Sequence, residues 1–409
     1  MEVDSPARPD LADRRARVAV AALFLTNGAL FANLIPRYPQ IKADLELSNA
    51  VYGLSVAAFP AGALLAGTAA GVLVRRFGSA PVATAGTILT GVGALLAGVA
   101  PAAWVFAAAL FLAGSLDAIT DVAQNAHGLR VQRRYGRSII NSFHAIWSIG
   151  AVTGGVMAAG AIAVGLPRGV HLAVSAGVFA VVALVALRFC LPGPDVEPAA
   201  DPESAERWRA SGVGARPTGR RTALVVAALV LIAVAGTTVE DAGNSWAAVY
   251  LSGPLDTPAA VAAWGYIALV GAQCVGRLAG DRLVDRFGQR TVARVGGLVI
   301  AAGMGVALAY PTVPGTILGF AAAGLGSATL VPAAMHEADE LPGVRPGTGL
   351  TLVSWLMRLG FLLSPPVVGA VADASSLRLG LIVVPVAGLV VVLAAGVLSQ
   401  SPRSRSRAG

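Results

Sequence analysis

The stretch VRRFGSAPV at residues 74–82 returns as VDRFGQRTV at residues 284–292, 210 residues further along the chain. Both copies keep the pattern Val-x-Arg-Phe-Gly, and both stand between two long apolar segments. A motif that recurs at the same place in two hydrophobic series indicates two related halves. The repeat therefore predicts a fold made of two similar domains.

The composition places this chain in a membrane. It has 409 residues, of which 56% are hydrophobic and only 13% are charged, whereas soluble domains contain about 25% charged residues. Apolar runs such as residues 18–35 and 380–398 have roughly the 20 residues that a helix needs to cross a bilayer. The first run is long enough to span and shows no cleavage pattern, so we expect it to remain in the protein.

Hydropathy predicts twelve spans in two groups of six. We expect a cytoplasmic N-terminus over residues 1–17, a six-helix bundle over 18–190, a cytoplasmic linker rich in Pro, Gly and charge over 191–221, a second six-helix bundle over 222–400, and a basic cytoplasmic tail over 401–409. The spans are expected to start near Val18, Asn49, Pro81, Ala103, Ser138, Gly169, Thr222, Pro258, Thr291, Pro314, Gly349 and Arg378.

Basic residues test this count. With twelve spans and the N-terminus inside, 25 Lys and Arg residues fall on the cytoplasmic side, four fall outside, and Arg358 lies within a span. Cytoplasmic loops of membrane proteins carry such an excess of positive charge. The bias predicts that both termini are cytoplasmic, and it explains the net charge of +8 without a nucleic-acid partner.

The loop motif and the twelve spans together resemble the major facilitator superfamily. Its signature between spans two and three is similar to GVLVRRFGSA from Gly71, with Arg75 where the family has Asp, and to GDRLVDRFGQR from Gly280. The resemblance implies an all-α membrane protein with two pseudo-symmetric six-helix bundles that rock about a central site. It also implies that the loops latch the inward-closed state through Arg76, Gly78, Asp285, Arg286, Gly288 and Arg290. The missing acid implies a weaker N-terminal latch.

A narrower resemblance concerns spans four, five and seven. The segments DVAQNAHGLRVQRRYGRSIINSFHAIWSIGAVTGG and EDAGNSWAAVY are similar to those of bacterial fucose-permease-type transporters. The drug/proton antiporters carry a Gly-Pro-x-x-Gly-Gly element in span five. Here GAVTGG from Gly150 has Ala151 in place of that Pro, which disfavours the antiporter interpretation.

Span four carries three polar residues on one helical stripe, Asp117, Asp121 and Asn125, with about 6 Å of rise between successive residues. A carboxylate inside a membrane faces a bundle interior or a watery cavity. In the superfamily that this chain resembles, span four lines the cavity. We expect Asp117 and Asn125 to bind substrate, and Asp117 and Asp121 to take part in proton coupling. The alternative is a carboxylate held permanently by an arginine or by helix N–H groups.

Span five adds His144 at a depth similar to that of Asp121. Because imidazole changes charge near neutral pH, a pair of these two side chains is a candidate proton relay. The alternative is a histidine that only hydrogen-bonds a neighbouring helix.

Span seven contains adjacent acids and an aromatic residue. Glu240 and Asn244 share one helical face and are expected to bind substrate, with Glu240 also a candidate for proton coupling. Trp246 is either a stacking surface for a ring-shaped substrate or an interfacial belt residue.

Two further residues interrupt apolar spans. Asn27 lies midway along span one, where an amide either binds substrate or hydrogen-bonds another helix. Arg358 lies inside span eleven and needs an acidic partner or an anionic ligand. If it pairs with a carboxylate of the other half, its role is gating.

These features predict a secondary active transporter of a small polar, sugar-like solute. We expect a proton symporter, monomeric, in the cytoplasmic (inner) membrane, with protons and the solute as its partners. No Gly-x-x-x-x-Gly-Lys-[Ser/Thr] motif occurs, so ATP hydrolysis is not indicated, and no enzyme activity, cofactor or metal is expected. Two alternatives remain: a proton-driven exporter of amphipathic compounds, and a solute receptor that does not transport.

Overall fold

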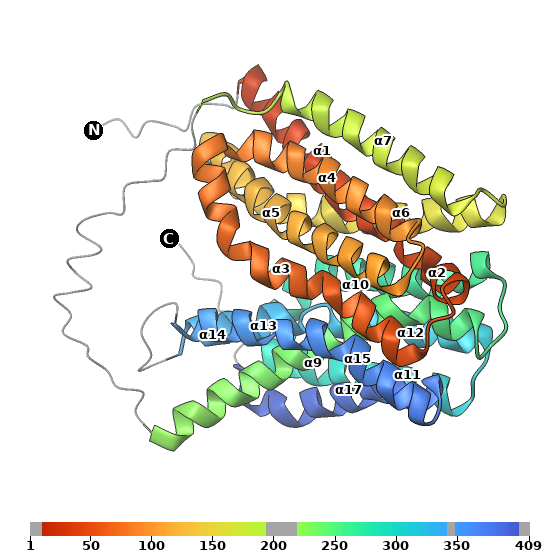
Figure 1. Cartoon of the computed structure of the whole chain (residues 1–409). Coiled ribbons are helices and arrows are strands. Elements are labelled where there is room, and N and C mark those ends of the chain that lie inside the picture. The colour runs from red at the N-terminus through yellow and green to blue at the C-terminus, as the bar shows by residue number, and fades with distance from the viewer. Residues whose placement is uncertain (1–9, 194–218, 342–347, 401–409) are drawn as a thin grey trace.

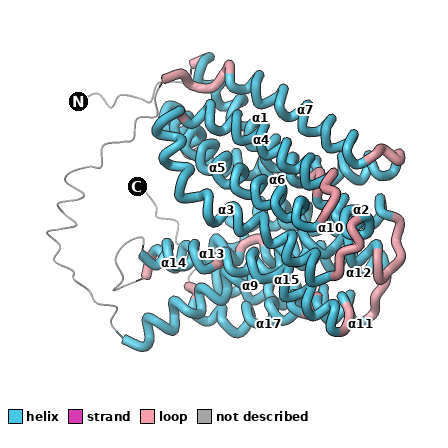
Figure 2. The backbone as a smooth tube through the Cα atoms, viewed as in Figure 1, coloured by secondary structure: helices cyan, strands magenta, loops and turns pink. Residues whose placement is uncertain are grey.

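A computed structural model describes residues 10–193, 219–341 and 348–400 of the chain. Helices and loops make up this part, and no strand occurs in it (Figure 2). The predicted basic tail, most of the predicted linker and the first nine residues lie outside the described ranges.

The N-terminal half consists of residues 10–193. Its helices are α1 (Leu11–Ala32), η1 (Ile35–Arg37), α2 (Tyr38–Asp44), α3 (Asn49–Phe77), α4 (Ser79–Gly98), α5 (Ala103–Tyr135), α6 (Ile140–Ala163) and α7 (Arg168–Leu187).

The C-terminal half begins with three long helices, α9 (Gly219–Ser252), α10 (Ala259–Phe287) and α11 (Gln289–Ala309). Each later span is divided into shorter helices: α12 (Val313–Ser327) with α13 (Leu330–Asp339), α14 (Thr348–Leu356) with α15 (Arg358–Ala374), and α16 (Leu377–Gly380) with α17 (Val383–Ala394) and η2 (Ala395–Val397).

Twelve helical segments of the described chain are long and apolar enough to cross a membrane. Eleven of them begin within three residues of the predicted starts. The first begins at Leu11 rather than Val18, because Asp10 and Asp13 form a capping box that starts the helix in the polar segment before the apolar run.

The two halves have the same internal packing. In the N-terminal half α3 and α4 pack on α5, α1 packs on α6, and α4 packs on α7. In the C-terminal half α10 and α11 pack on α12, α9 packs on α15, and α11 packs on α17. Two seams join the halves, α3 with α15 and α6 with α10, and these are also equivalent under the repeat (Figure 1).

The repeated motif forms the same turn twice. Gly78 ends α3 and precedes α4, and Gly288 ends α10 and precedes α11. Their φ/ψ values are 86°/150° and 79°/154°, a region that is essentially restricted to glycine. In both copies the arginine before the Phe-Gly pair lies over the phenylalanine ring. The motif therefore builds two matching helix–helix turns.

The C-terminal turn is also closed against the end of the chain. The Nε atom of Arg290 donates to the carbonyl of Leu398 at 2.9 Å, and its backbone N–H donates to the carbonyl of Ser399 at 3.1 Å. A Cβ atom at Gly288 would lie only 2.6 Å from the carbonyl oxygen of Gln400.

We expect Gly288→Ala to destabilise the protein. The backbone conformation alone costs about 1–3 kcal/mol for a residue with a side chain, and the close carbonyl adds to it. Gly305→Ala is the control, because no atom lies within 4 Å of its added Cβ. Thermal unfolding of the detergent-solubilised protein measures the difference; equal melting temperatures for the two variants would contradict this account of the turn.

Candidate functional site

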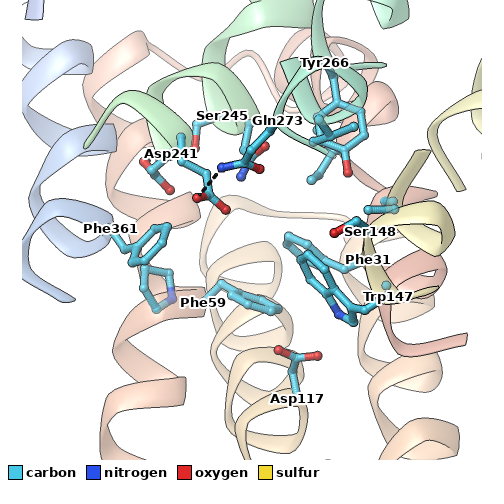
Figure 3. Close-up of a pocket in the computed structure, with 18 of the residues that line it drawn as sticks. Phe31, Phe59, Asp117, Trp147, Ser148, Asp241, Ser245, Tyr266, Gln273 and Phe361 are labelled. Carbon is cyan, nitrogen blue, oxygen red and sulfur yellow. Dashed lines mark hydrogen bonds between the residues drawn. The ribbon is translucent and has the colours of Figure 1, made fainter. Parts of the chain in front are cut away.

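A cavity of about 260 Å³ lies between the two halves (Figure 3). Its wall on the side of the N-terminal half comes from α1, α3, α5 and α6, and the opposite wall comes from α9, α10 and α15. The polar and charged residues of the lining are Asn27, Asp117, Ser148, Glu240, Asp241, Asn244, Ser245, Gln273 and Arg277.

The wall of the N-terminal half contains a chain of three hydrogen-bonded side chains. The indole Nε1 of Trp147 donates to Oδ1 of Asn27 at 2.7 Å, and Nδ2 of Asn27 donates to Oδ1 of Asp117 at 2.9 Å. The Asn27 amide thus uses both of its ends inside the protein. It fixes the orientation of the Asp117 carboxylate and leaves the other carboxylate oxygen for a ligand or a proton.

On the opposite wall a carboxylate is likewise hydrogen-bonded by an amide, here the longer side chain of Gln273. Nε2 of Gln273 donates to Oε2 of Glu240 at 2.8 Å, and the guanidinium of Arg277 lies 3.5 Å from the same oxygen. Gln273 and Arg277 lie one turn apart on α10. Each wall therefore presents a carboxylate held by an amide, and of these two carboxylates only Glu240 has a cation as its partner within the described part of the chain.

Asp241 adds a third carboxylate to the lining. Its side chain is buried and accepts a long hydrogen bond of 3.5 Å from Ser245. Because Asp241 and Glu240 are consecutive on α9, they approach the cavity from neighbouring faces of one helix.

Aromatic side chains cover much of the remaining lining: Phe31, Tyr38, Phe59, Trp147, Tyr266 and Phe361. Phe31 and Phe59 pack with ring centroids 4.1 Å apart, next to Trp147 and above Asp117 in Figure 3. The cavity thus combines flat apolar surfaces with polar groups at its two ends.

The two ends of the bundle differ in how the halves meet. We call the end where α1 begins the terminus side, at the left of Figure 1, and the end that carries α2 the far side. On the far side the hydroxyl of Tyr52 donates to the backbone carbonyl of Ser245 in the other half at 2.6 Å. A buried layer of Tyr38, Tyr52, Trp246 and Tyr266 closes the cavity there.

On the terminus side polar groups of both halves reach solvent. Nδ2 of Asn125 donates to Oδ1 of Asp121 at 3.0 Å, and Nε2 of His144 lies 3.1 Å from Oδ1 of Asn125. Arg358 is exposed on the facing half, where it interacts electrostatically with Asp121. Since the far side is sealed, the cavity opens toward the terminus side.

Four predicted site residues line the cavity: Asn27, Asp117, Glu240 and Asn244. Asn125, Asp121 and His144 lie nearer to the terminus side, where the Asn125 amide bonds both of the others, so His144 hydrogen-bonds a neighbouring helix and the candidate relay would pass through Asn125. Trp246, interpreted from the sequence as either a stacking surface or an interfacial belt residue, is fully buried outside the cavity lining and packs edge-on against Tyr52, with centroids 4.9 Å apart.

The prediction that Arg358 is the only basic residue well inside a span is wrong, because Arg277 lies within α10 and reaches the cavity. Sequence reasoning assigned Arg277 to the cytoplasmic charge and passed over Gln273. Their spacing of four residues in the part of α10 before Gly280, which is otherwise apolar, was the available signal. The aromatic lining carried no such signal, because an aromatic residue in a membrane helix is most often packing.

Arg358 itself begins α15, directly after the break between α14 and α15 at Met357. In the described part of the chain no carboxylate lies within 4 Å of its guanidinium. In the same ranges no three His, Cys, Asp or Glu side chains gather as a candidate metal site.

Two helical bundles around a central polar cavity define a membrane transporter. The chain belongs to the Major Facilitator Superfamily, whose family model matches residues 20–282 and 229–409. Its relatives include an uncharacterized transporter, y4wD, of Sinorhizobium fredii, 31% identical over 93% of this chain and 97% of the relative. The membrane protein MosC of Rhizobium meliloti is 28% identical over 92% of this chain and 88% of its own length.

Solved structures show the same fold at low identity. A bacterial homologue of the human lysosomal transporter Spinster, in an inward-facing and unoccupied conformation, has a TM-score of 0.72 at 16% identity and covers 95% of this chain and 98% of its own. A D-xylose-proton symporter has a TM-score of 0.67 at 16% identity, over 93% and 96%. These likenesses concern the fold; the narrower resemblance to fucose-permease-type transporters stays a prediction.

We expect the effects on stability of substituting Glu240 and Arg277 to be coupled. Arg277→Gln leaves the partly buried carboxylate with Gln273 alone and should lower the melting temperature. Glu240→Gln in the same chain should restore most of the loss, with a coupling of about 0.5–3 kcal/mol.

Thermal unfolding of both single variants and the double variant measures this coupling. Arg282→Gln, at an exposed position of the same helix, is the control. Strictly additive effects in the cycle would rule out the coupling.

Proposed function

We propose that this protein is a proton-coupled secondary active transporter that moves a small polar, sugar-like solute by alternating access. The observation that carries the proposal is the pair of amide-held carboxylates, Asp117 with Asn27 and Glu240 with Gln273, which face one cavity from opposite halves. A ligand bound between them contacts both halves, so its binding energy changes when the halves move relative to one another.

The size and chemistry of the cavity favour a small solute. At about 260 Å³ it lies just below the range of roughly 300–1,000 Å³ that is typical of sites for drug-sized ligands. Carboxylates and amide oxygens accept hydrogen bonds from hydroxyl groups, whereas Arg277 and the amide N–H groups donate. The rings of Phe31, Phe59 and Trp147 supply flat surfaces for the apolar face of a ring.

Proton coupling follows from the cost of charge in a closed cavity. When both ends are shut, an ionised carboxylate without a cation is unfavourable. Among the described residues Asp117 has an amide but no cation within 4 Å as its partner, so a proton or a positively charged ligand must accompany it through the occluded state. We assign it the coupling role, with Glu240 as the second candidate. Asp121, Asn125 and His144 provide polar groups for proton exit on the terminus side.

Gating is assigned to groups near the terminus side. Arg358 interacts electrostatically with Asp121 of the other half, and we propose that they form an ion pair when this side closes. The repeated turns, with Arg76, Gly78, Asp285, Arg286, Gly288 and Arg290, are proposed to latch the same closed state. By the distribution of basic residues the terminus side is cytoplasmic, and we propose a monomer in the inner membrane with both termini inside.

Neutralising the coupling carboxylates tests the mechanism. In liposomes with an imposed proton gradient, Asp117→Asn and Glu240→Gln should lower concentrative uptake at least 10-fold, because each of these variants lacks a site that releases a proton. Exchange of solute at equal pH on both sides should be retained. The solute is first found by a thermal-shift screen of sugars, sugar acids and nucleosides at two pH values.

Asp256→Asn, at an exposed loop position, is the matched control and should keep the uptake of the unmodified protein. If Asp117→Asn and Glu240→Gln both leave uptake and its pH profile intact, the coupling mechanism is incorrect.

The aromatic lining favours one alternative, a proton-driven exporter of amphipathic compounds. Six aromatic residues line the cavity, and such surfaces bind apolar cargo as readily as the face of a sugar. Transport in vesicles of both orientations separates the two directions. A protein that binds the solute but gives no exchange in either orientation would instead be a receptor.

A further inference from the structure

The two halves are joined on the far side by a carboxylate that caps a helix of the other half. Asp373 lies at the end of α15, and its Oδ1 and Oδ2 atoms accept hydrogen bonds from the backbone N–H groups of Asn49 at 2.9 Å and Ala50 at 2.8 Å. These are the first two residues of α3. The first N–H groups of a helix have no partner within that helix, and the positive end of the helix dipole attracts an anion.

Helix α3 does not need Asp373 in order to form. Its own cap is Ser48, whose hydroxyl oxygen accepts the N–H of Val51 at 3.2 Å. Asp373 stands 324 residues from Asn49 in the chain. It accepts hydrogen bonds from the N–H groups of Asn49 and Ala50, which Ser48 does not cap. The contact therefore joins the two halves and adds little to the local structure of either.

The helices of this seam touch closely beside the cap. A Cβ atom at Gly369 would lie 2.3 Å from the carbonyl oxygen of Asn49, and one at Gly53 would lie 2.3 Å from the carbonyl oxygen of Pro365. Such backbone contact places the Asp373 carboxylate within hydrogen-bonding distance of α3. When the far ends of α3 and α15 separate, both hydrogen bonds must break.

The surroundings of Asp373 also favour a contact that can open. Asp373 is exposed, so water can replace it on the freed N–H groups. Its own carboxylate also stays solvated when the halves separate. Lys42, which belongs to α2 of the same half as α3, interacts electrostatically with it. The N-terminal half thus offers two positive partners to one carboxylate of the other half.

The second seam has no equivalent. From Gly155 in α6, the counterpart of α15, to Pro167 beyond the end of that helix, no residue is acidic, and α10, the counterpart of α3, begins after Pro258. Gly155 there lies against Tyr266 and Ile267. The charged contact is therefore confined to one of the two seams.

We propose that Asp373 is a far-side latch that stabilises the conformation open to the terminus side and is released each time the cavity opens to the far side. The latch rests on the proposed alternating access. It requires neither a particular solute nor proton coupling, since it concerns the empty protein. Its strength sets the ratio of the two empty conformations, and hence the side from which a solute finds the site.

Spin labels on the far side test the latch directly. Val164 follows α6 in one half and Tyr310 follows α11 in the other, and they are 79% and 76% exposed. With Cys190 and Cys274 replaced by Ser, Val164→Cys and Tyr310→Cys carry the labels. Pulsed dipolar spectroscopy of the full-length protein in lipid nanodiscs then measures the distance between the halves.

Asp373→Asn should increase the population with the longer distance about 3- to 10-fold over the unmodified protein, because an amide offers one acceptor oxygen where the carboxylate offers two and loses the attraction to the helix dipole. Asp44→Asn is the matched control. Asp44 pairs with Arg168 at 2.8 Å on the same side, but both residues belong to the N-terminal half, so the distances should not change.

Gly369→Ala supplies a steric reference, because its added Cβ forces the same two helices apart and marks the distance of the opened seam. A distance distribution in Asp373→Asn that equals that of the unmodified protein overturns the latch. Failure of the proposed transport is recognised separately, since solute uptake does not enter this measurement.

Discussion

The structure depends on one constraint: a polar group inside a membrane protein needs a partner from the protein or from water. Asn27 satisfies the constraint on one wall by bonding Trp147 and Asp117 at once. Gln273 and Arg277 satisfy it on the other wall around Glu240. These groups come from helices of both halves, so the cavity exists only because the two bundles face one another.

The far side and the terminus side provide partners for their polar groups in different ways. The far side excludes water with a buried aromatic layer, and its Tyr52 hydroxyl finds a backbone carbonyl in the other half. The terminus side admits water, and its polar groups stay solvated beside the helix ends. The two ends of the bundle therefore differ, although the two halves are built on one repeated plan.

Much of the fold was predictable from the sequence, because membrane helices are specified by long apolar runs and the repeat fixes their grouping. Asp117, Asn27 and Glu240 were also predictable, since a polar residue in such a run needs a special environment. Gln273 and Arg277 were missed because their place in the cavity depends on the depth of α10, not on composition. The burial of Trp246 depends on its contact with Tyr52 across the halves, which no local pattern encodes.

The last three spans are each interrupted, whereas most spans of the N-terminal half are not. Spans two to six of the N-terminal half are continuous helices, whereas α12 and α13, α14 and α15, and α16 and α17 are each joined by a short non-helical step. Bending in a helix concentrates where its hydrogen-bond ladder is interrupted. We therefore expect bending of the C-terminal half to concentrate at these three steps.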